Sequence, residues 1–95
     1  MENAEIARVF EEIGDLLELR QANTFRVRSY REAARTLRDH PRRIDELAHQ
    51  GHDLTELPHI GAGMADKIDE ILESGTCRRR EQLAAELPRE LTELM

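Results

Sequence analysis

The chain has 95 residues, of which 36% are charged, and its formal net charge of −6 argues against a broad electrostatic grip on nucleic acid. This length predicts one domain over residues 1–95, and no apolar run is long enough to cross a membrane. The start of the sequence is no signal peptide, and a single cysteine, Cys77, favours a cytoplasmic location without an internal disulfide. With two Phe and one Tyr, base stacking cannot be the main mode of recognition.

The charges are unevenly distributed along the chain. Residues 20–43 carry eight arginines against two carboxylates, whereas residues 44–73 carry eight carboxylates against Lys67 alone. Residues 78–80 form a second cluster of arginines. Two interpretations are open: a local anion-binding face, or a solvated helix surface of alternating charge. The charges by themselves favour the second interpretation.

Helical spacing of apolar residues predicts three helices in the first half of the chain. The first begins with Asn3 as its N-cap and carries Ile6, Val9, Phe10, Ile13, Leu16 and Leu17. The second runs from about Thr24 to Asp39, before Pro41, and is expected to bury Phe25, Tyr30, Ala33, Ala34 and Leu37. A short third helix contains Ile44, Leu47 and Ala48, and Gly51 is its natural C′ residue.

The second half predicts a one-turn helix, a tight turn and two further helices. Asp53 caps a helical turn through Leu57, and residues 58–61 form the turn. The next helix starts at Ala62, ends at Gly75 and carries Met64, Ala65, Ile68, Ile71 and Leu72 on one face. The last helix contains Leu83, Ala84 and Leu87 and ends at Pro88. No alternation of period two occurs, so the predicted fold class is all-α, a compact bundle of four to five short helices.

The most specific pattern runs from Leu57 through Pro58, His59, Ile60, Gly61, Ala62 and Gly63 into the following helix. Unpaired N–H groups at a helix N-terminus form a ready phosphate site, and Gly61 and Gly63 let a phosphate approach the main chain. Pro58 fixes the entry to the turn, and Ile60 can anchor it in the core. The pattern predicts a helix-hairpin-helix at about residues 53–73 that binds the DNA backbone. The alternative is a tight structural turn.

Nearly the full length resembles the amino-terminal lyase domain of family X DNA polymerases, of the DNA polymerase beta type and its bacterial relatives. The matching stretches are residues 3–7, 25–34 and 57–72. The resemblance implies binding of gapped, nicked or 5′-phosphorylated DNA in base-excision-type repair. It also implies a following polymerase core, which would carry the polymerase carboxylates, and work at the bacterial nucleoid. This chain alone would therefore not polymerise nucleotides.

Lys67 is the single lysine beside thirteen arginines. Arginine cannot serve as an amine nucleophile, whereas a neutral lysine can form a Schiff base with a sugar aldehyde. The resemblance places Lys67 on the lysine that attacks C1′ of a 5′-deoxyribose phosphate or an abasic site. The alternative, which we favour from the sequence, is a phosphate contact or a surface lysine paired with Glu70. Whether the chain is an enzyme therefore stays open.

The resemblance assigns further phosphate-binding residues. Arg26 and Arg79 fall on phosphate-binding lysines of the family, and Tyr30 falls on a tyrosine that lines the same pocket. Gly63 and Thr55 stand where the family has further lysines.

The turn itself departs from the family at His59, which replaces the usual glycine, and a position that needs a positive φ suits His less well. The resemblance also implies a monovalent cation, Na⁺ or K⁺, held by the carbonyl oxygens of Thr55, Leu57 and Ile60 when DNA is bound.

No other cofactor is expected. No ligand-like grouping with carboxylates or with Cys77 is found for His40, His49 and His52, so we predict no transition-metal site. A third class of function is a small acidic helical module that binds protein.

Overall fold

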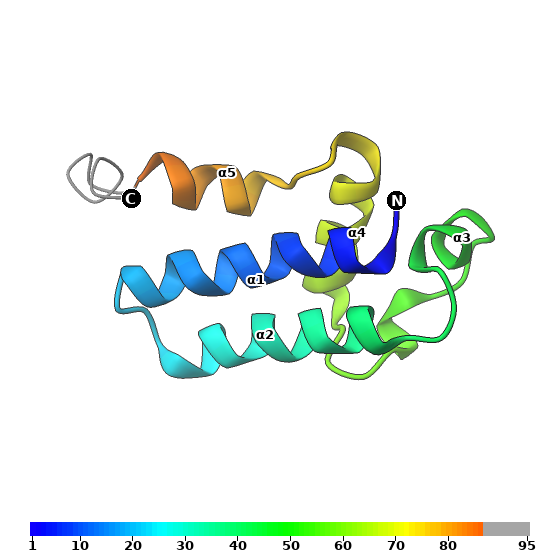
Figure 1. The fold of residues 1–95 in the computed structure, drawn as a ribbon, viewed down its shortest axis with the longest axis horizontal. Coiled ribbons are helices and arrows are strands. Elements are labelled where there is room, and N and C mark those ends of the chain that lie inside the picture. Colours follow the sequence, from blue (N-terminus) through cyan, green and yellow to red (C-terminus); the bar gives the residue numbers. More distant parts are fainter. Residues whose placement is uncertain (87–95) are drawn as a thin grey trace.

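Two long antiparallel helices, α1 (Asn3–Leu19) and α2 (Thr24–Asp39), lie side by side, and α5 (Arg78–Ala85) runs along the opposite side of α1 (Figure 1). In the same view α4 (Ala62–Ser74) crosses behind α1, and α3 (Ile44–His49) lies beyond the ends of the long pair. The 3-10 turn η1 (Leu54–Glu56) precedes α4. This computed structural model describes residues 1–86. Within them all regular structure is helical, which confirms the predicted bundle.

The core forms around α1 because its apolar residues recur with the helical period and face α2, α4 and α5. The rings of Phe10 and Tyr30 pack with their centroids 6.0 Å apart. The predicted core residues on these helices that are buried are Ile6, Val9, Phe10, Ile13, Leu17, Tyr30, Ala33, Ala34, Leu37, Ile68, Ile71 and Leu83. The predicted positions Leu16, Ala48, Met64, Ala65 and Leu72 pack against this core while partly buried.

The prediction that Phe25 is buried is wrong, because its side chain is 73% exposed. Val27 takes the first core position of α2 instead. A helix turns by about 100° per residue, so Phe25, two residues earlier, lies on roughly the opposite side of α2 from Val27.

The prediction that Asn3 caps α1 is also wrong. Glu2 is the N-cap, and its backbone N–H donates to the side chain of Glu5 at 3.2 Å. The amide of Asn3 instead reaches the segment before α3: its Nδ2 donates to the carbonyl of Arg42 at 2.7 Å, and its Oδ1 accepts from the N–H of Ile44 at 2.8 Å. Asn3 therefore ties the start of α1 to the start of α3.

The other helix ends follow the sequence. Glycine at 51 and 75 adopts the positive φ that ends α3 and α4, at 79° and 83°. The side chain of Asn23 caps α2 by accepting from the N–H of Phe25. The predicted Leu87 and Pro88 of the last helix lie outside the described residues. Among residues 1–86, none of the helices combines the length and the hydropathy needed to span a bilayer.

Candidate nucleic-acid interface

The hairpin consists of η1, the turn at residues 57–61 and α4. The carboxylate of Asp53 accepts hydrogen bonds from the hydroxyl and the backbone N–H of Thr55, at 2.6 and 3.0 Å, and these bonds lower the pKa of the Asp53 carboxyl. Leu54 and Ile60 are 6% and 3% exposed. These two buried side chains anchor η1 and the turn in the core, so the backbone between residues 54 and 60 is held in place.

The N-terminus of α4 faces open space. Gly61 is its N-cap, and no side chain caps the helix. The carbonyl of Gly61 accepts from the N–H of Ala65 at 2.9 Å, so the N–H groups of Ala62, Gly63 and Met64 precede the first helical bond. A Cβ atom built on Gly61 or on Gly63 would meet no atom within 4 Å. Free donors, the positive end of the helix dipole and this open space suit a bound phosphate.

His59 occupies the left-handed region at the tip of the turn, with φ of 64°. This conformation costs a residue other than glycine about 1 kcal/mol or more. The Nδ1 atom of His59 lies 3.2 Å from a carboxylate oxygen of Glu32 on α2. The side chain of His59 therefore links the tip of the turn to α2.

Lys67 lies on α4 with its Nζ atom 3.4 Å from the carbonyl oxygen of Gly63 and 5.9 Å from the centroid of the Tyr30 ring. Its side chain is half-buried, and Tyr30 is buried. The alternative that pairs Lys67 with Glu70 is not found, because the carboxylate of Glu70 lies 3.8 Å from the guanidinium of Arg78. No described carboxylate makes an ion pair with Lys67.

A family model described as a helix-hairpin-helix domain matches residues 1–77. The chain belongs to this helix-hairpin-helix family. It is also 32% identical over 95 residues to the N-terminal region of the DNA polymerase/3′-5′ exonuclease PolX of Bacillus subtilis, a family X polymerase. The match covers all of this chain and 16% of that relative. The resemblance to family X is therefore confirmed, and it supports DNA binding in a polymerase-related context.

Most arginines of the helix-hairpin-helix domain are engaged within the fold. Arg31 pairs with Asp15 and Glu18 on α1, and its hydrogen bond to Glu18 raises the pKa of its guanidinium. Arg38 lies 2.6 Å from Glu11. On α5, Arg80 is likewise engaged within the fold, because it pairs with Glu12 and Glu81. The basic stretches seen in the sequence therefore offer less charge to a ligand than their length indicates.

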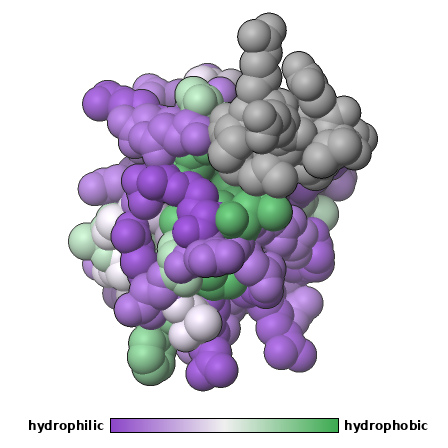
Figure 2. Space-filling model, turned by 90° about the vertical axis from the view of Figure 1, so that its left-hand side faces the viewer, coloured by the Kyte–Doolittle hydropathy of each residue, from purple (hydrophilic) through white to green (hydrophobic). Residues whose placement is uncertain are grey.

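Four arginines make no ion pair with any carboxylate of residues 1–86: Arg26, Arg28, Arg42 and Arg79. Arg26 lies one turn before Tyr30 on α2, and Arg79 lies in the first turn of α5. The structure brings Lys67 of α4 and Tyr30 of α2 together, whereas no hydrogen bond within residues 1–86 joins Arg26 or Arg79 to either of them. Figure 2 shows the end of the molecule where α1 turns into α2, and hydrophilic residues cover most of it.

The carbonyl groups of Thr55, Leu57 and Ile60 lie in η1 and in the turn that follows it. The Leu57 carbonyl accepts a hydrogen bond from the N–H of Ile60 at 3.1 Å, which closes the turn. Carbonyl oxygens are hard ligands that suit Na⁺ or K⁺ without any charged side chain. Within residues 1–86, no three His, Cys, Asp or Glu side chains come close enough together to hold a metal ion.

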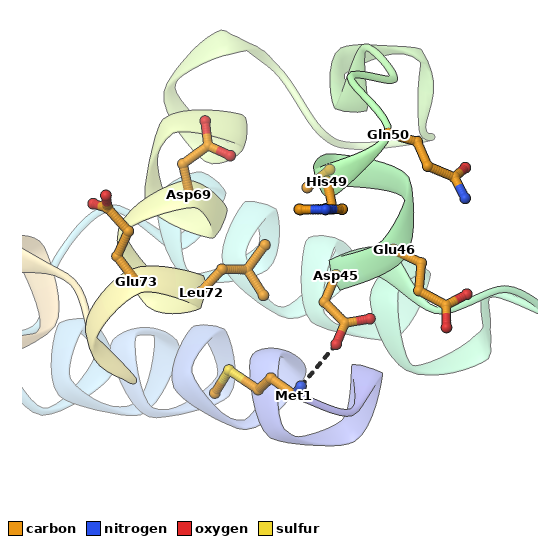
Figure 3. Close-up of a pocket in the computed structure, with 9 residues that line it drawn as sticks. Met1, Asp45, Glu46, His49, Gln50, Asp69, Leu72 and Glu73 are labelled. Atoms are coloured by element: carbon orange, nitrogen blue, oxygen red, sulfur yellow. Dashed lines mark hydrogen bonds and ion pairs between the residues drawn. The ribbon is translucent and has the colours of Figure 1, made fainter.

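A cavity of about 730 Å³ lies away from the hairpin tip, between α3, α4 and the first residue of the chain (Figure 3). Four carboxylates line it, from Asp45, Glu46, Asp69 and Glu73. Sequence reasoning did not find this cavity, although the excess of carboxylates in residues 44–73 was a signal of it. Its charge repels a phosphate backbone, so it is separate from the interface described above.

Proposed function

We propose that this domain binds DNA at gaps or nicks that carry a 5′-phosphate, in base-excision-type repair, as part of or derived from a family X polymerase. The observation that carries the proposal is the open N-terminus of α4, where free N–H groups at a Gly-x-Gly sequence face empty space. Such a site needs no side-chain charge. DNA binding is thereby compatible with a net charge of −6.

In this proposal the main-chain N–H groups at Gly61, Ala62 and Gly63 hold one backbone phosphate. Arg26 and Arg79, with the hydroxyl of Tyr30, orient the 5′-phosphate on the downstream side of the gap. A terminal phosphate carries more negative charge than an internal diester, close to −2 at neutral pH. Two arginines free of carboxylate partners therefore favour a DNA end over a continuous duplex.

The proposal includes a monovalent cation at the carbonyl oxygens of Thr55, Leu57 and Ile60 in the DNA complex. The cation would supply one positive charge between the turn and a phosphate. Because this ligand set consists of main-chain oxygens, replacing side chains at these positions would leave it in place.

A titration of gapped, 5′-phosphorylated DNA at several salt concentrations tests the proposal. Since few phosphates are neutralised, the slope of log K against log salt is expected to be about −2 to −4, corresponding to about two to four phosphates. Intact duplex of the same sequence serves as the control and should bind more weakly. A steeper slope, or equal affinity for gapped and intact DNA, would reject the proposal.

A second candidate function is a 5′-deoxyribose-phosphate lyase with Lys67 as nucleophile. It is favoured by the position of the Lys67 amine, which no described carboxylate holds and which lies next to the Tyr30 ring. The amine would add to C1′ of the open sugar and lose water to form a Schiff base. Loss of a C2′ proton then breaks the C3′–O3′ bond, which releases the downstream 5′-phosphate, and water frees the lysine.

Borohydride added during the reaction reduces the Schiff base and would trap a covalent protein–DNA complex. Lys67→Arg should abolish trapping and keep most of the DNA affinity, because the charge remains and the nucleophile does not. The amine of Met1 is the one other primary amine of the chain. Trapping that survives Lys67→Arg but disappears when Met1 is blocked would reject the lyase and leave DNA binding intact.

A further inference from the structure

The cavity between α3 and α4 is a groove lined by apolar side chains, by the ring of His49 and by carboxylates (Figure 3). Its apolar lining contains the side chains of Met1, Ala48 and Leu72, which also pack against the core while partly buried. Carboxylates from both helices line the groove as well, and its volume of about 730 Å³ falls in the range of sites that accept several side chains or a small ligand.

The charges of the groove are only partly compensated. Asp45 pairs with Arg43 at 2.9 Å and with the Met1 ammonium at 2.7 Å, and these partners hold the pKa of its carboxyl well below its usual range. In contrast, Glu46, Asp69 and Glu73 make no ion pair within the part of the chain that the structure describes. Three negative charges therefore face solvent beside the apolar side chains of the groove.

The groove and the candidate DNA interface use different sides of α4. Asp69 and Glu73 are one turn apart and lie on the same side of the helix. At about 100° per residue, Asp69 lies about 200° around the helix from Lys67. An occupant of the groove would therefore leave the side that carries Lys67 open.

The chemistry of the groove selects its occupant. Phosphates are repelled by the carboxylates, and no three ligand-type side chains of residues 1–86 come together to hold a metal ion. What complements the groove is a group that offers cations at its edges and an apolar side chain at its centre. We propose that the groove docks a short basic amphipathic segment of a partner protein, with arginine or lysine beside leucine-like side chains. This interaction goes beyond DNA binding and does not depend on it.

The probe for the test is a capped ten-residue peptide in which arginine and leucine alternate. Amide shifts of the isotope-labelled chain are followed during titration with this peptide, and a second peptide with serine in place of leucine serves as the control. Shifts that saturate and are largest in α3 and α4, with weaker binding of the serine peptide, are expected. Failure of the leucine peptide to bind, or shifts spread over all acidic surfaces, would overturn the proposal.

Two variants identify the groove as the binding site. Asp69→Asn with Glu73→Gln removes two charges of the groove and is expected to weaken peptide binding about fivefold to tenfold, since exposed ion pairs contribute modestly. Asp39→Asn with Glu56→Gln makes the same change in net charge on exposed residues outside the groove and should change binding by less than about twofold.

Ala48→Arg fills the groove and adds a positive charge there, so it should abolish peptide binding although all four carboxylates of the groove are retained. Circular dichroism checks that each variant stays helical. Neither groove variant should weaken the binding of gapped DNA. Equal losses in the groove pair and the control pair would show that the peptide binds through net charge. Full binding in Ala48→Arg would show that it binds outside the groove, and either result would overturn the proposal.

Discussion

The α1–α2 pair and the hairpin with α4 use charge in opposite ways. Between α1 and α2, guanidinium groups such as those of Arg31 and Arg38 pair with carboxylates of the facing helix. At the hairpin, the groups available to a ligand are the main-chain N–H groups at the start of α4. The single lysine of the chain, Lys67, lies on the same helix and has no described carboxylate partner. The charged side chains between α1 and α2 pair with one another and stabilise the fold, whereas the N–H groups and the lysine of α4 stay available to a ligand.

The number of arginines is therefore a poor measure of a DNA-binding surface. An arginine held by two carboxylates, as Arg31 is, must give up both partners before it can neutralise a phosphate. A helix N-terminus has no such competitor, because its N–H groups have no partner within the helix. Substitutions in each region can therefore separate binding from stability.

The largest effect is expected from Gly63→Asp, which places a carboxylate in the first turn of α4. An acidic residue there favours the helix dipole, and replacing glycine reduces the entropy of the unfolded chain, so the free energy of unfolding should rise by about 1 kcal/mol. The same carboxylate repels a phosphate at the N-terminus, so affinity for gapped DNA should fall about tenfold or more. Thermal melting and DNA titration measure the two effects.

Gly63→Ala is the matched control for this substitution. It removes the glycine without adding charge, and a Cβ at this position meets no atom within 4 Å. Its free energy of unfolding should rise by a few tenths of a kcal/mol, up to about 1 kcal/mol, with DNA affinity nearly unchanged. If Gly63→Asp bound gapped DNA as tightly as Gly63→Ala, the phosphate would not lie at the start of α4.

A smaller effect is expected from arginine substitutions that compare a free group with an engaged one. Arg26→Gln should lower affinity for gapped DNA about fivefold and make the salt slope shallower by about 1, since one phosphate contact is lost. Arg38→Gln should leave the slope unchanged and lower the free energy of unfolding by up to about 1 kcal/mol, because it loses a partly exposed ion pair with Glu11. Equal changes in slope for both variants would contradict the distinction between the two regions.

The smallest effect is expected at His59, where the hairpin contacts α2. His59→Gly relieves the left-handed backbone but loses the contact with Glu32, and exposed contacts of this kind contribute about 0–1 kcal/mol. The net result should be an increase of less than about 1 kcal/mol in the free energy of unfolding, measured by urea denaturation. Glu32→Gln, which loses the contact and keeps the strain, should instead lower it by a few tenths of a kcal/mol. A large loss of stability in His59→Gly would show that the contact with Glu32 outweighs the strain.

The helices could be predicted from the sequence because their signals are local. Apolar spacing marks the buried faces of α1 and α4, and glycine at 51 and 75 marks two helix ends where only a positive φ continues the chain. Two predictions failed for different reasons. Asn3 resembles an N-cap, yet its amide bonds the backbone before α3, an interaction across the fold. Phe25 is apolar but lies about 200° around α2 from the buried Val27, so the helical period itself places it outside the core.

The hairpin could also be predicted, because its turn is encoded in consecutive residues. The partners of the arginines could not, since each depends on which carboxylate of α1 faces it across the bundle. The acidic groove needs α3 and α4 to converge, and the sequence alone shows only their shared excess of negative charge. The DNA-binding, lyase and cation roles of particular residues stay predictions.

The burial of Cys77 has a practical consequence for spectroscopy. Cys77 is 2% exposed where α5 begins, and a buried thiol reacts slowly with alkylating reagents. A cysteine introduced at Ser29, on the exposed side of α2, or at Gln50, beside the acidic groove, would therefore take up a maleimide dye while the native thiol stays unmodified. Fluorescence from the first labelled chain would report on DNA approaching α2, and fluorescence from the second on a peptide entering the groove.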